Sequence, residues 1–290
     1  MKAPTASPNS RSKYIELSVI VPLKNPPGIR WIRYLEKVLP DNSEIILVGE
    51  KMPQKAIASG RITMLRAKCS RSQARNIGLS TSHGELVFFL DADQLPSKAL
   101  FREILELFRR GYDAIKVPEK FMATTRWGKA SALWKQSVQK ADKEYGCIPR
   151  AYSRNILLKV KGFDARLDVT EDFTLYMKVR KLGIKEAWAS SSLYHLEEDN
   201  LLEIITKSIL YTEALLSIRK DDTDFKATIA KYAAILKVFV RAMSSKAKPD
   251  VKICCILLIV TRLLLLTVKI VEKLLEICRS YFLKGRIKKQ

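Results

Sequence analysis

Two carboxylates lie two residues apart in the segment FFLDADQLP, which spans residues 88–96. Asp91 and Asp93 directly follow a run of apolar residues. Carboxylate oxygens are the ligands that hard divalent cations prefer, and a cation held there can bind a diphosphate. Such an ion would neutralise charge that develops on a phosphate leaving group. Because acidic pairs are also common on protein surfaces, the spacing alone leaves both a metal site and a solvated surface open.

A second acidic pair and one histidine are the other residues that could take part in chemistry. Glu171 and Asp172 begin the helical pattern EDFTLYMKVRKLG. Acidic residues complement the helix dipole at this position, so a purely structural role is one interpretation. His195 follows in the segment LYHLEED, and a lone histidine is nearly as often a satisfied core residue as a ligand.

The elements that must position these residues can be predicted from the apolar pattern. Short apolar runs alternate with helical patterns over residues 14–200, which indicates βαβ units around a mostly parallel sheet. The run at residues 85–90, ELVFFL, is typical of a strand buried on both faces. Ligands bind at the carboxyl edge of such sheets, where Asp91 and Asp93 are expected. We predict strands at 17–21, 45–48, 62–65 and 85–90, and helices at 29–39 and 72–79.

Several further segments accompany the aspartates in a fixed order. They are SVIVPLKN at 18–25, SQARNIGLSTSHGE at 72–85, KGFDARLDVTEDFTLYMKVRKLG at 161–183 and the LYHLEED segment. In order and spacing, these blocks resemble glycosyltransferase family 2 over roughly residues 16–200. The resemblance implies the GT-A fold of nucleotide-diphospho-sugar transferases, a Rossmann-like mixed sheet flanked by helices.

The resemblance implies a set of residues that bind the donor. Pro22 matches the position where the first strand of the family meets the nucleotide. Arg75 and Asn76 match the ARN element of the family, whose arginine lies near the base and phosphates, although Arg75 could also be a helix-surface residue. Asp91 would contact the ribose or the donor sugar.

Metal binding and catalysis are implied in the same way. Asp93 would ligate Mn²⁺ or Mg²⁺, and His195 matches a position that often reaches the metal or the diphosphate. Glu171 and Asp172 match the ED pair of the family, in which the residue at the Asp172 position deprotonates the acceptor hydroxyl. That hydroxyl then attacks the anomeric carbon in line and inverts it.

The chain departs from the family pattern at two places. Residues 47–52 read LVGEKM where the family usually reads VVDDGS, so Gly49 and Glu50 replace two aspartates. Glu50 can still accept a hydrogen bond from a base edge, but the donor nucleotide stays open between UDP and GDP. The chain also lacks the QxxRW sequence of processive synthases, which favours a single transfer.

The last third of the chain has a different character. Residues 201–290 form a helical appendage, with helices expected at 201–219, 225–243 and 251–283. Residues 253–260 are all apolar, and the charges from Arg262 onward share one helical face, which is typical of a helix lying in a membrane interface. A membrane crossing would place Arg262 near its middle at a cost of about 2.5–3.5 kcal/mol. Interfacial binding is favoured, with a single span or packing against the catalytic domain or another subunit as alternatives.

Composition limits the partners of the chain. The 290 residues hold 52 Lys and Arg against 30 Asp and Glu, a net charge of +22, which favours polyanionic partners such as anionic lipid, phosphorylated substrates or nucleic acid without choosing among them. Basic residues next to apolar segments tend to remain inside the cell, so an anionic membrane surface on the cytoplasmic side is expected. The five cysteines form no CxxC pair, and residues 1–13 are expected to be a flexible N-terminus without a secretory signal. Nucleic acid is not expected, because no helix-turn-helix, zinc or RNP motif is recognisable.

Two functions are therefore compared. The first is a sugar transfer to a membrane-associated acceptor, such as a polyprenyl phosphate or a lipid-linked glycan. The second is a non-enzymatic membrane- or nucleic-acid-binding protein on a degenerate glycosyltransferase scaffold, against which the retained acidic residues argue. Trp127 and Trp134 could line an acceptor groove or pack in the core.

Overall fold

A seven-stranded mixed sheet forms the centre of the molecule. The computed structural model describes residues 14–25, 27–53, 60–141, 147–167, 169–217 and 235–287, so the predicted flexible residues 1–13 lie outside the described residues. The strand order is β3-β2-β1-β4-β8-β6-β9. The strands are β1 (Leu17–Leu23), β2 (Ser43–Gly49), β3 (Ile62–Arg66), β4 (Leu86–Phe89), β6 (Ala114–Lys116), β8 (Pro149–Ser153) and β9 (Glu186–Trp188).

The sheet confirms the predicted mixed α/β fold class. Strands β3, β2, β1 and β4 are parallel, as the alternation of apolar runs and helices predicts. Strand β8 is antiparallel to both of its neighbours, β4 and β6, which makes the sheet mixed. All four residues of β4 are buried, and the strand lies between β1 and β8 in the middle of the sheet.

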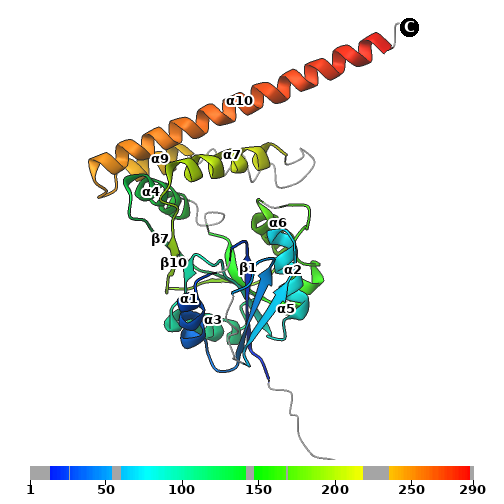
Figure 1. The fold of residues 1–290 in the computed structure, drawn as a ribbon, viewed down its shortest axis with the longest axis vertical. Helices are drawn as coiled ribbons and strands as arrows, with labels where there is room; N and C mark the ends of the chain where they lie inside the picture. Colours follow the sequence, from blue (N-terminus) through cyan, green and yellow to red (C-terminus); the bar gives the residue numbers. More distant parts are fainter. Residues whose placement is uncertain are drawn as a thin grey trace, which may run out of the picture.

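Helices cover both faces of this sheet (Figure 1). Helices α1 (Ile29–Val38) and α3 (Lys98–Arg109) bury apolar side chains such as Leu35 and Phe101 against one face. Helices α2 (Arg71–Thr81), α5 (Arg154–Lys159) and α6 (Glu171–Arg180) bury others, such as Leu79 and Leu175, against the opposite face. Each face thus has its own apolar core, and the sheet separates the two.

A small second sheet extends from the carboxyl edge of the large one. It has the order β5-β10-β7, from β5 (Gln94–Leu95), β7 (Glu119–Met122) and β10 (Leu193–Leu196). Strand β10 pairs antiparallel with β5 and parallel with β7. The segment that follows Asp91 is thereby joined to two segments much farther along the chain.

The C-terminal helices pack on helix α4 (Arg126–Ala141), which follows strand β7 of the small sheet (Figure 1). Helices α7 (Leu201–Ser217), α9 (Ile235–Met243) and α10 (Pro249–Ile287) share an apolar cluster with α4. Trp127 and Trp134 pack against this cluster, so core packing is the role that the structure shows for both. Arg262 also lies in this packing, where its Nε donates to Ser208 Oγ over 3.1 Å and its guanidinium covers the Trp134 ring.

The outward side of α10 carries a stripe of exposed apolar side chains, which we call the α10 stripe. Its members repeat every 11 residues, a period close to that of a straight helix, so they stay on one face. Their side chains are between 46% and 62% exposed. The α10 stripe consists of Ile253, Leu257, Val260, Leu264, Val268, Val271 and Leu275.

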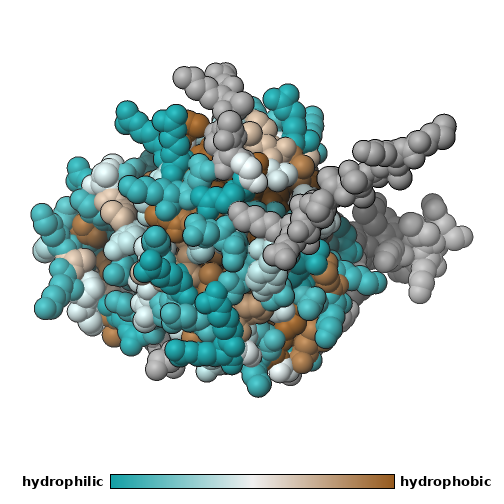
Figure 2. Space-filling view, turned by 90° about the horizontal axis from the view of Figure 1, so that it is seen from below, coloured by the Kyte–Doolittle hydropathy of each residue, from teal (hydrophilic) through white to brown (hydrophobic). Residues whose placement is uncertain are grey.

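The opposite end of the molecule has a different surface. Figure 2 views that end, and hydrophilic residues cover most of it, with apolar residues only scattered between them. Within the described residues, no helix combines the length and the apolar character required to cross a bilayer.

Candidate active site

The two aspartates lie in a tight turn after β4. The Asp91 N–H donates to Gln94 Oε1 over 3.0 Å, and the Gln94 N–H donates to the Asp91 carbonyl over 3.0 Å. Helix α1 holds this turn from outside, because Trp31 Nε1 donates to the Gln94 carbonyl over 2.9 Å. The turn therefore fixes where both carboxylates lie at the edge of the sheet.

Arg75 joins the two acidic segments that the sequence singles out. Its Nη2 lies 2.9 Å from Asp91 Oδ1, and its Nη1 lies 2.9 Å from Glu171 Oε1. Helix α2 presents Arg75 from its second turn, after a capping box in which Ser70 and Gln73 satisfy backbone N–H groups at its start. The residues near positions 91 and 171 thus meet around one buried guanidinium.

The charges of this cluster shift the pKa values of its acids in opposite directions. Burial disfavours the ionised form of Asp91, but the guanidinium groups of Arg75 and Arg150 outweigh it and hold the pKa of Asp91 well below its ordinary range. For Glu171, burial and the neighbouring Asp172 carboxylate raise the pKa, against the opposing effect of Arg75. Asp91 is consequently a fixed anion whose oxygens already accept from two arginines.

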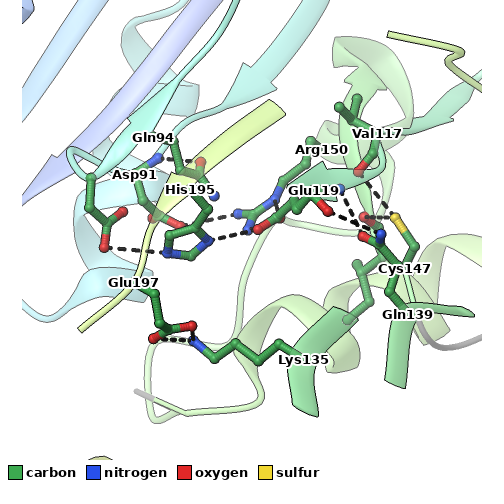
Figure 3. Close-up of polar contacts among 12 residues, drawn as sticks. Asp91, Gln94, Val117, Glu119, Lys135, Gln139, Cys147, Arg150, His195 and Glu197 are labelled. Carbon is green, nitrogen blue, oxygen red and sulfur yellow. Dashed lines mark hydrogen bonds and ion pairs between the residues drawn. The ribbon is translucent and has the colours of Figure 1, made fainter. Parts of the chain in front are cut away.

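The small sheet brings His195 to the same place. His195 on β10 lies beside Gln94 of β5 and Phe121 of β7. Its Nε2 lies 3.5 Å from Asp93 Oδ2, and its Nδ1 lies 2.7 Å from Glu119 Oε2. Burial lowers the pKa of His195, but hydrogen bonds to Asp93 and Glu119 outweigh burial and raise it to about 9. Figure 3 shows the His195 ring directed at Glu119.

Arg150, at the start of β8, connects the histidine to Asp91. Its Nε and Nη2 donate to Glu119 Oε1 over 2.9 and 2.6 Å, and its Nη1 donates to Asp91 Oδ2 over 3.2 Å. Burial disfavours the charged form of Glu119, but Arg150 and His195 lower its pKa to about 2. Arg150 and Glu119 are therefore held as a buried ion pair between the two predicted site segments (Figure 3).

A cavity of about 220 Å³ opens beside this network. Asp172 and His195 both lie on its wall, whereas the other predicted catalytic residue, Glu171, and the other predicted metal ligand, Asp93, do not. Helix α4 contributes part of the wall through Lys135, whose Nζ lies 2.9 Å from Glu197 Oε1. Other lining residues are Arg75, Glu119, Phe121, Gln139, Cys147 and Arg150.

Of the predicted donor-binding residues, Arg75 lines this cavity, whereas Pro22, Glu50, Asn76 and Asp91 do not. Pro22 lies on β1, and Glu50 is exposed directly after β2. The Asn76 amide is occupied by the backbone of Phe163, since its Nδ2 donates to the carbonyl and its Oδ1 accepts from the N–H, both over 2.9 Å. Their roles toward a nucleotide stay predictions.

Sequence reasoning missed Glu119 and Arg150. Glu119 is the first residue of β7 and Arg150 the second residue of β8, and a charged side chain in a strand needs a partner wherever that strand is buried. Which partners they have depends on the pairing of β7 with β10, a contact between segments more than 70 residues apart, for which local patterns provide no information.

The arrangement fits a divalent metal at Asp93 and His195. A carboxylate oxygen and an imidazole nitrogen lie within 3.5 Å of each other, and Asp93 is half exposed toward solvent. Among the described residues, no group of three or more Asp, Glu, His or Cys forms a complete metal cage. Mn²⁺ and Mg²⁺ commonly take one or two protein ligands and complete their shell with substrate phosphates and water, so two donors are compatible with an ion that binds together with a diphosphate.

Comparison with known sequences identifies the family. Residues 33–167, which include α1, β4 and Asp91, match the family described as Glycosyl transferase family 2. These residues are a glycosyltransferase family 2 domain. The predicted relationship is therefore confirmed, and Asp172 and His195 lie beyond the matched residues.

One relative and two solved structures are similar to the glycosyltransferase domain and its surroundings. The undecaprenyl-phosphate 4-deoxy-4-formamido-L-arabinose transferase of Aeromonas hydrophila is 28% identical over 163 residues, which cover 49% of this chain and 50% of the relative. The chain thus matches half of the length of that relative. A second similar protein is the mannosyltransferase PcManGT from Pyrobaculum calidifontis, solved in complex with GDP-Man and Mn²⁺. It is 17% identical with a TM-score of 0.49, and the match covers 81% of this chain and 77% of the PcManGT chain. The structure of S. aureus TarS is 15% identical with a TM-score of 0.48, and the match covers 87% of this chain and 81% of the TarS chain.

Proposed function

We propose that this protein is an inverting glycosyltransferase that moves a sugar from a UDP- or GDP-linked donor to a membrane-associated acceptor. The observation that carries the proposal is the shared cavity. Asp172, from the start of α6, and His195, from β10, line it together with Arg75 and Arg150. The cavity wall thus carries a proposed general base, cationic groups for a diphosphate and one proposed metal ligand, His195. The second proposed ligand, Asp93, has its Oδ2 3.5 Å from His195 Nε2.

Asp172 is the proposed base. Its position in the first turn of α6 fixes the carboxylate on the cavity wall, where Oδ1 accepts from the Phe173 N–H over 2.8 Å. It would remove the proton from an acceptor hydroxyl as that oxygen bonds to the anomeric carbon and the nucleoside diphosphate leaves. A phosphate acceptor is already anionic near neutral pH, and Asp172 would then orient it instead.

The cationic side of the cavity would bind the donor. Arg75 and Arg150 are each held by two carboxylates, so their guanidinium planes are fixed before a ligand arrives. Fixed charges stabilise a developing anion without reorganising at the moment of reaction. Asp93 and His195 would hold Mn²⁺ or Mg²⁺, which when bound neutralises charge on the diphosphate.

The acceptor is proposed to be a polyprenyl phosphate or a lipid-linked glycan. The name of the Aeromonas relative, an undecaprenyl-phosphate transferase, supports this class of acceptor. The α10 stripe supports a membrane location, because it exposes about 33 Å of apolar helix face, at 1.5 Å per residue over 22 residues. Positions 262, 269 and 273 are Lys or Arg, and the helical period places these positions on the side of α10 away from the stripe. Such a helix would lie on the cytoplasmic side of the cell membrane as a peripheral or monotopic anchor.

A transfer assay with Asp172→Asn tests the proposal. UDP- and GDP-sugars are first ranked by thermal shift with Mn²⁺ or Mg²⁺, since a ligand of the folded state raises the Tm. The best donor is then assayed with a polyprenyl phosphate and with a hydroxyl acceptor. We expect Asp172→Asn to bind the donor as the wild type does and to lose roughly 10²- to 10⁴-fold in kcat toward the hydroxyl acceptor, and less toward the phosphate.

Asp41→Asn is the matched control, because Asp41 is exposed beside the amino end of β2, away from the cavity. It should behave as the wild type. A wild-type protein that binds no nucleotide sugar and transfers none would contradict the proposal. Binding to DNA or to lipid without any transfer would favour the non-enzymatic alternative.

A further inference from the structure

We infer that Glu119 is a positioning residue that orients His195, so that its Nε2 faces Asp93 as a ligand for the metal. This inference rests on the metal-assisted transfer proposed above. Glu119 itself touches neither Asp93 nor Asp172 in any contact that the structure describes. Its effect would therefore be exerted through the histidine ring.

The first part of the case is how the Glu119 carboxylate is divided between its partners. Oε1 accepts both hydrogen bonds from Arg150, over 2.9 and 2.6 Å. Oε2 is left to accept from His195 Nδ1 over 2.7 Å. An ionised carboxylate can only accept, so it requires a proton on Nδ1. The neutral ring then carries its lone pair on Nε2, the nitrogen that lies 3.5 Å from Asp93 Oδ2.

The second part is that the backbone of Glu119 and the ring of His195 are both held in place by their neighbours. Its N–H donates to Gln139 Oε1 over 2.8 Å, and its carbonyl accepts from Gln139 Nε2 over 3.2 Å. The pairing of β7 with β10 places Glu119 and His195 on the same side of the small sheet, because Leu193 is paired with Glu119 and His195 with Phe121. The Phe121 ring lies 5.3 Å from the imidazole ring and limits its rotation.

The third part is the general behaviour of histidines that bind metals. Such a histidine usually donates its other N–H to a carboxylate, which fixes the tautomer and strengthens the ligand. Loss of that carboxylate typically lowers metal affinity about 10- to 100-fold. Glu119 has the position and the charge for this role, and its Oε2, which Arg150 does not occupy, is bonded to His195 Nδ1.

Histidine NMR provides a direct test, because the chain has only two histidines, His83 and His195. In metal-free wild-type protein at about pH 10, we expect the ¹⁵N shifts of His195 to show the Nδ1–H tautomer. In Glu119→Gln, this preference should weaken, because the amide carries no charge and can also donate. A wild-type His195 with its proton on Nε2 would overturn the inference, without a variant and without any activity measurement.

Mn²⁺ binding at neutral pH provides the second readout. Mn²⁺ should broaden the His195 signals and spare those of His83, which lies before β4, roughly 25 Å from Asp91 at about 3.3 Å per strand residue. Glu119→Gln should weaken Mn²⁺ affinity about 10- to 100-fold, measured by electron paramagnetic resonance. Unchanged Mn²⁺ affinity in Glu119→Gln would overturn the inference.

A second carboxylate–histidine pair serves as the control. Glu44 Oε2 lies 3.3 Å from Nδ1 of His83, and His83 is exposed. Glu44→Gln should leave Mn²⁺ affinity and the His195 shifts unchanged. If wild-type His195 shows the expected tautomer but Mn²⁺ leaves its signals sharp, the metal proposal fails and this inference fails with it, while sugar transfer itself is still judged by the assay with Asp172→Asn.

Discussion

Arg75 shows how a single residue can determine whether this site exists. Its side chain is 3% exposed and bridges two carboxylates from separate segments of the chain, Asp91 after β4 and Glu171 at the start of α6. A buried ion pair often contributes little net stability, yet removal of one partner leaves a buried charge without compensation. Substitution of Arg75 is therefore expected to lower the free energy of unfolding as well as to disturb the site.

We predict that Arg75→Met destabilises the protein by about 3 kcal/mol, measured by urea unfolding, because two carboxylates lose a cationic partner. Arg166→Met is the matched control. Arg166 also pairs with a carboxylate, Asp164, but its side chain is 88% exposed. Exposed pairs contribute at most about 1 kcal/mol, so equal losses in the two variants would contradict this account.

At the scale of elements, α3 is joined to the segment between β9 and β10 by one carboxylate. Glu103 accepts from the Ser190 N–H over 2.5 Å, from the Ser190 hydroxyl over 2.7 Å and from the Ser191 N–H over 2.9 Å. Burial raises the pKa of Glu103, but these hydrogen bonds outweigh burial and lower it from 4.5 to about 2. The connection therefore depends on an ionised side chain.

This connection predicts a pH-dependent stability. A carboxylate with a lowered pKa stabilises the folded state fully above its unfolded pKa, near 4.5, and this contribution is lost as the pH falls through its folded pKa, near 2. Glu103→Gln should cost about 1 kcal/mol at pH 7, after allowance for solvent screening, and the cost should shrink between pH 4.5 and 2. Glu106→Gln, on the exposed side of α3, should show no such dependence in the same unfolding experiment.

Some elements of the fold could be predicted from the sequence, whereas contacts between distant elements could not. Strand β4 and its terminal aspartates were predictable, because an unbroken apolar run that ends at two carboxylates is a local signal. The ends of α2 agree with the prediction within two residues. The contact of Glu119 with His195 was not predictable, because it depends on the pairing of β7 with β10 and on the return of the chain to the Asp91 turn. The occupation of Asn76 by the backbone of Phe163 was missed for the same reason.

At the scale of the whole molecule, the two ends have different surfaces. The end shown in Figure 2 is mostly hydrophilic, whereas α10 exposes the apolar side chains of its stripe at the other end. The buried side of α10, with Cys255 and Leu258, packs in the cluster with α4 and α7. Of the alternatives for this helix, packing on the rest of the chain is realised along its first half, and the side chains of the α10 stripe are exposed.

We predict that the protein floats with anionic liposomes and that Leu264→Glu reduces the bound fraction several-fold. Leu264 is 62% exposed at the centre of the α10 stripe, where a carboxylate would have to enter the interface. Leu182→Glu is the matched control, since Leu182 is 50% exposed after α6, outside the stripe. A Leu264→Glu protein that floats like the wild type would contradict the anchor. A protein whose α10 stripe instead joins two copies would sediment as a dimer without lipid.

Helix α4 contributes to both the cavity and the C-terminal cluster, and this double role limits how such a protein can diversify. Lys135 and Gln139 face the cavity, while Ala130 and Trp134 on a neighbouring face pack against the C-terminal helices. If the cavity binds substrate as proposed, evolution can exchange the first group only while the second group continues to fit the C-terminal helices. Selection for specificity and selection for packing would therefore act on two neighbouring faces of one helix, and an engineer who grafts a new cavity onto this scaffold would have to transfer both sets together.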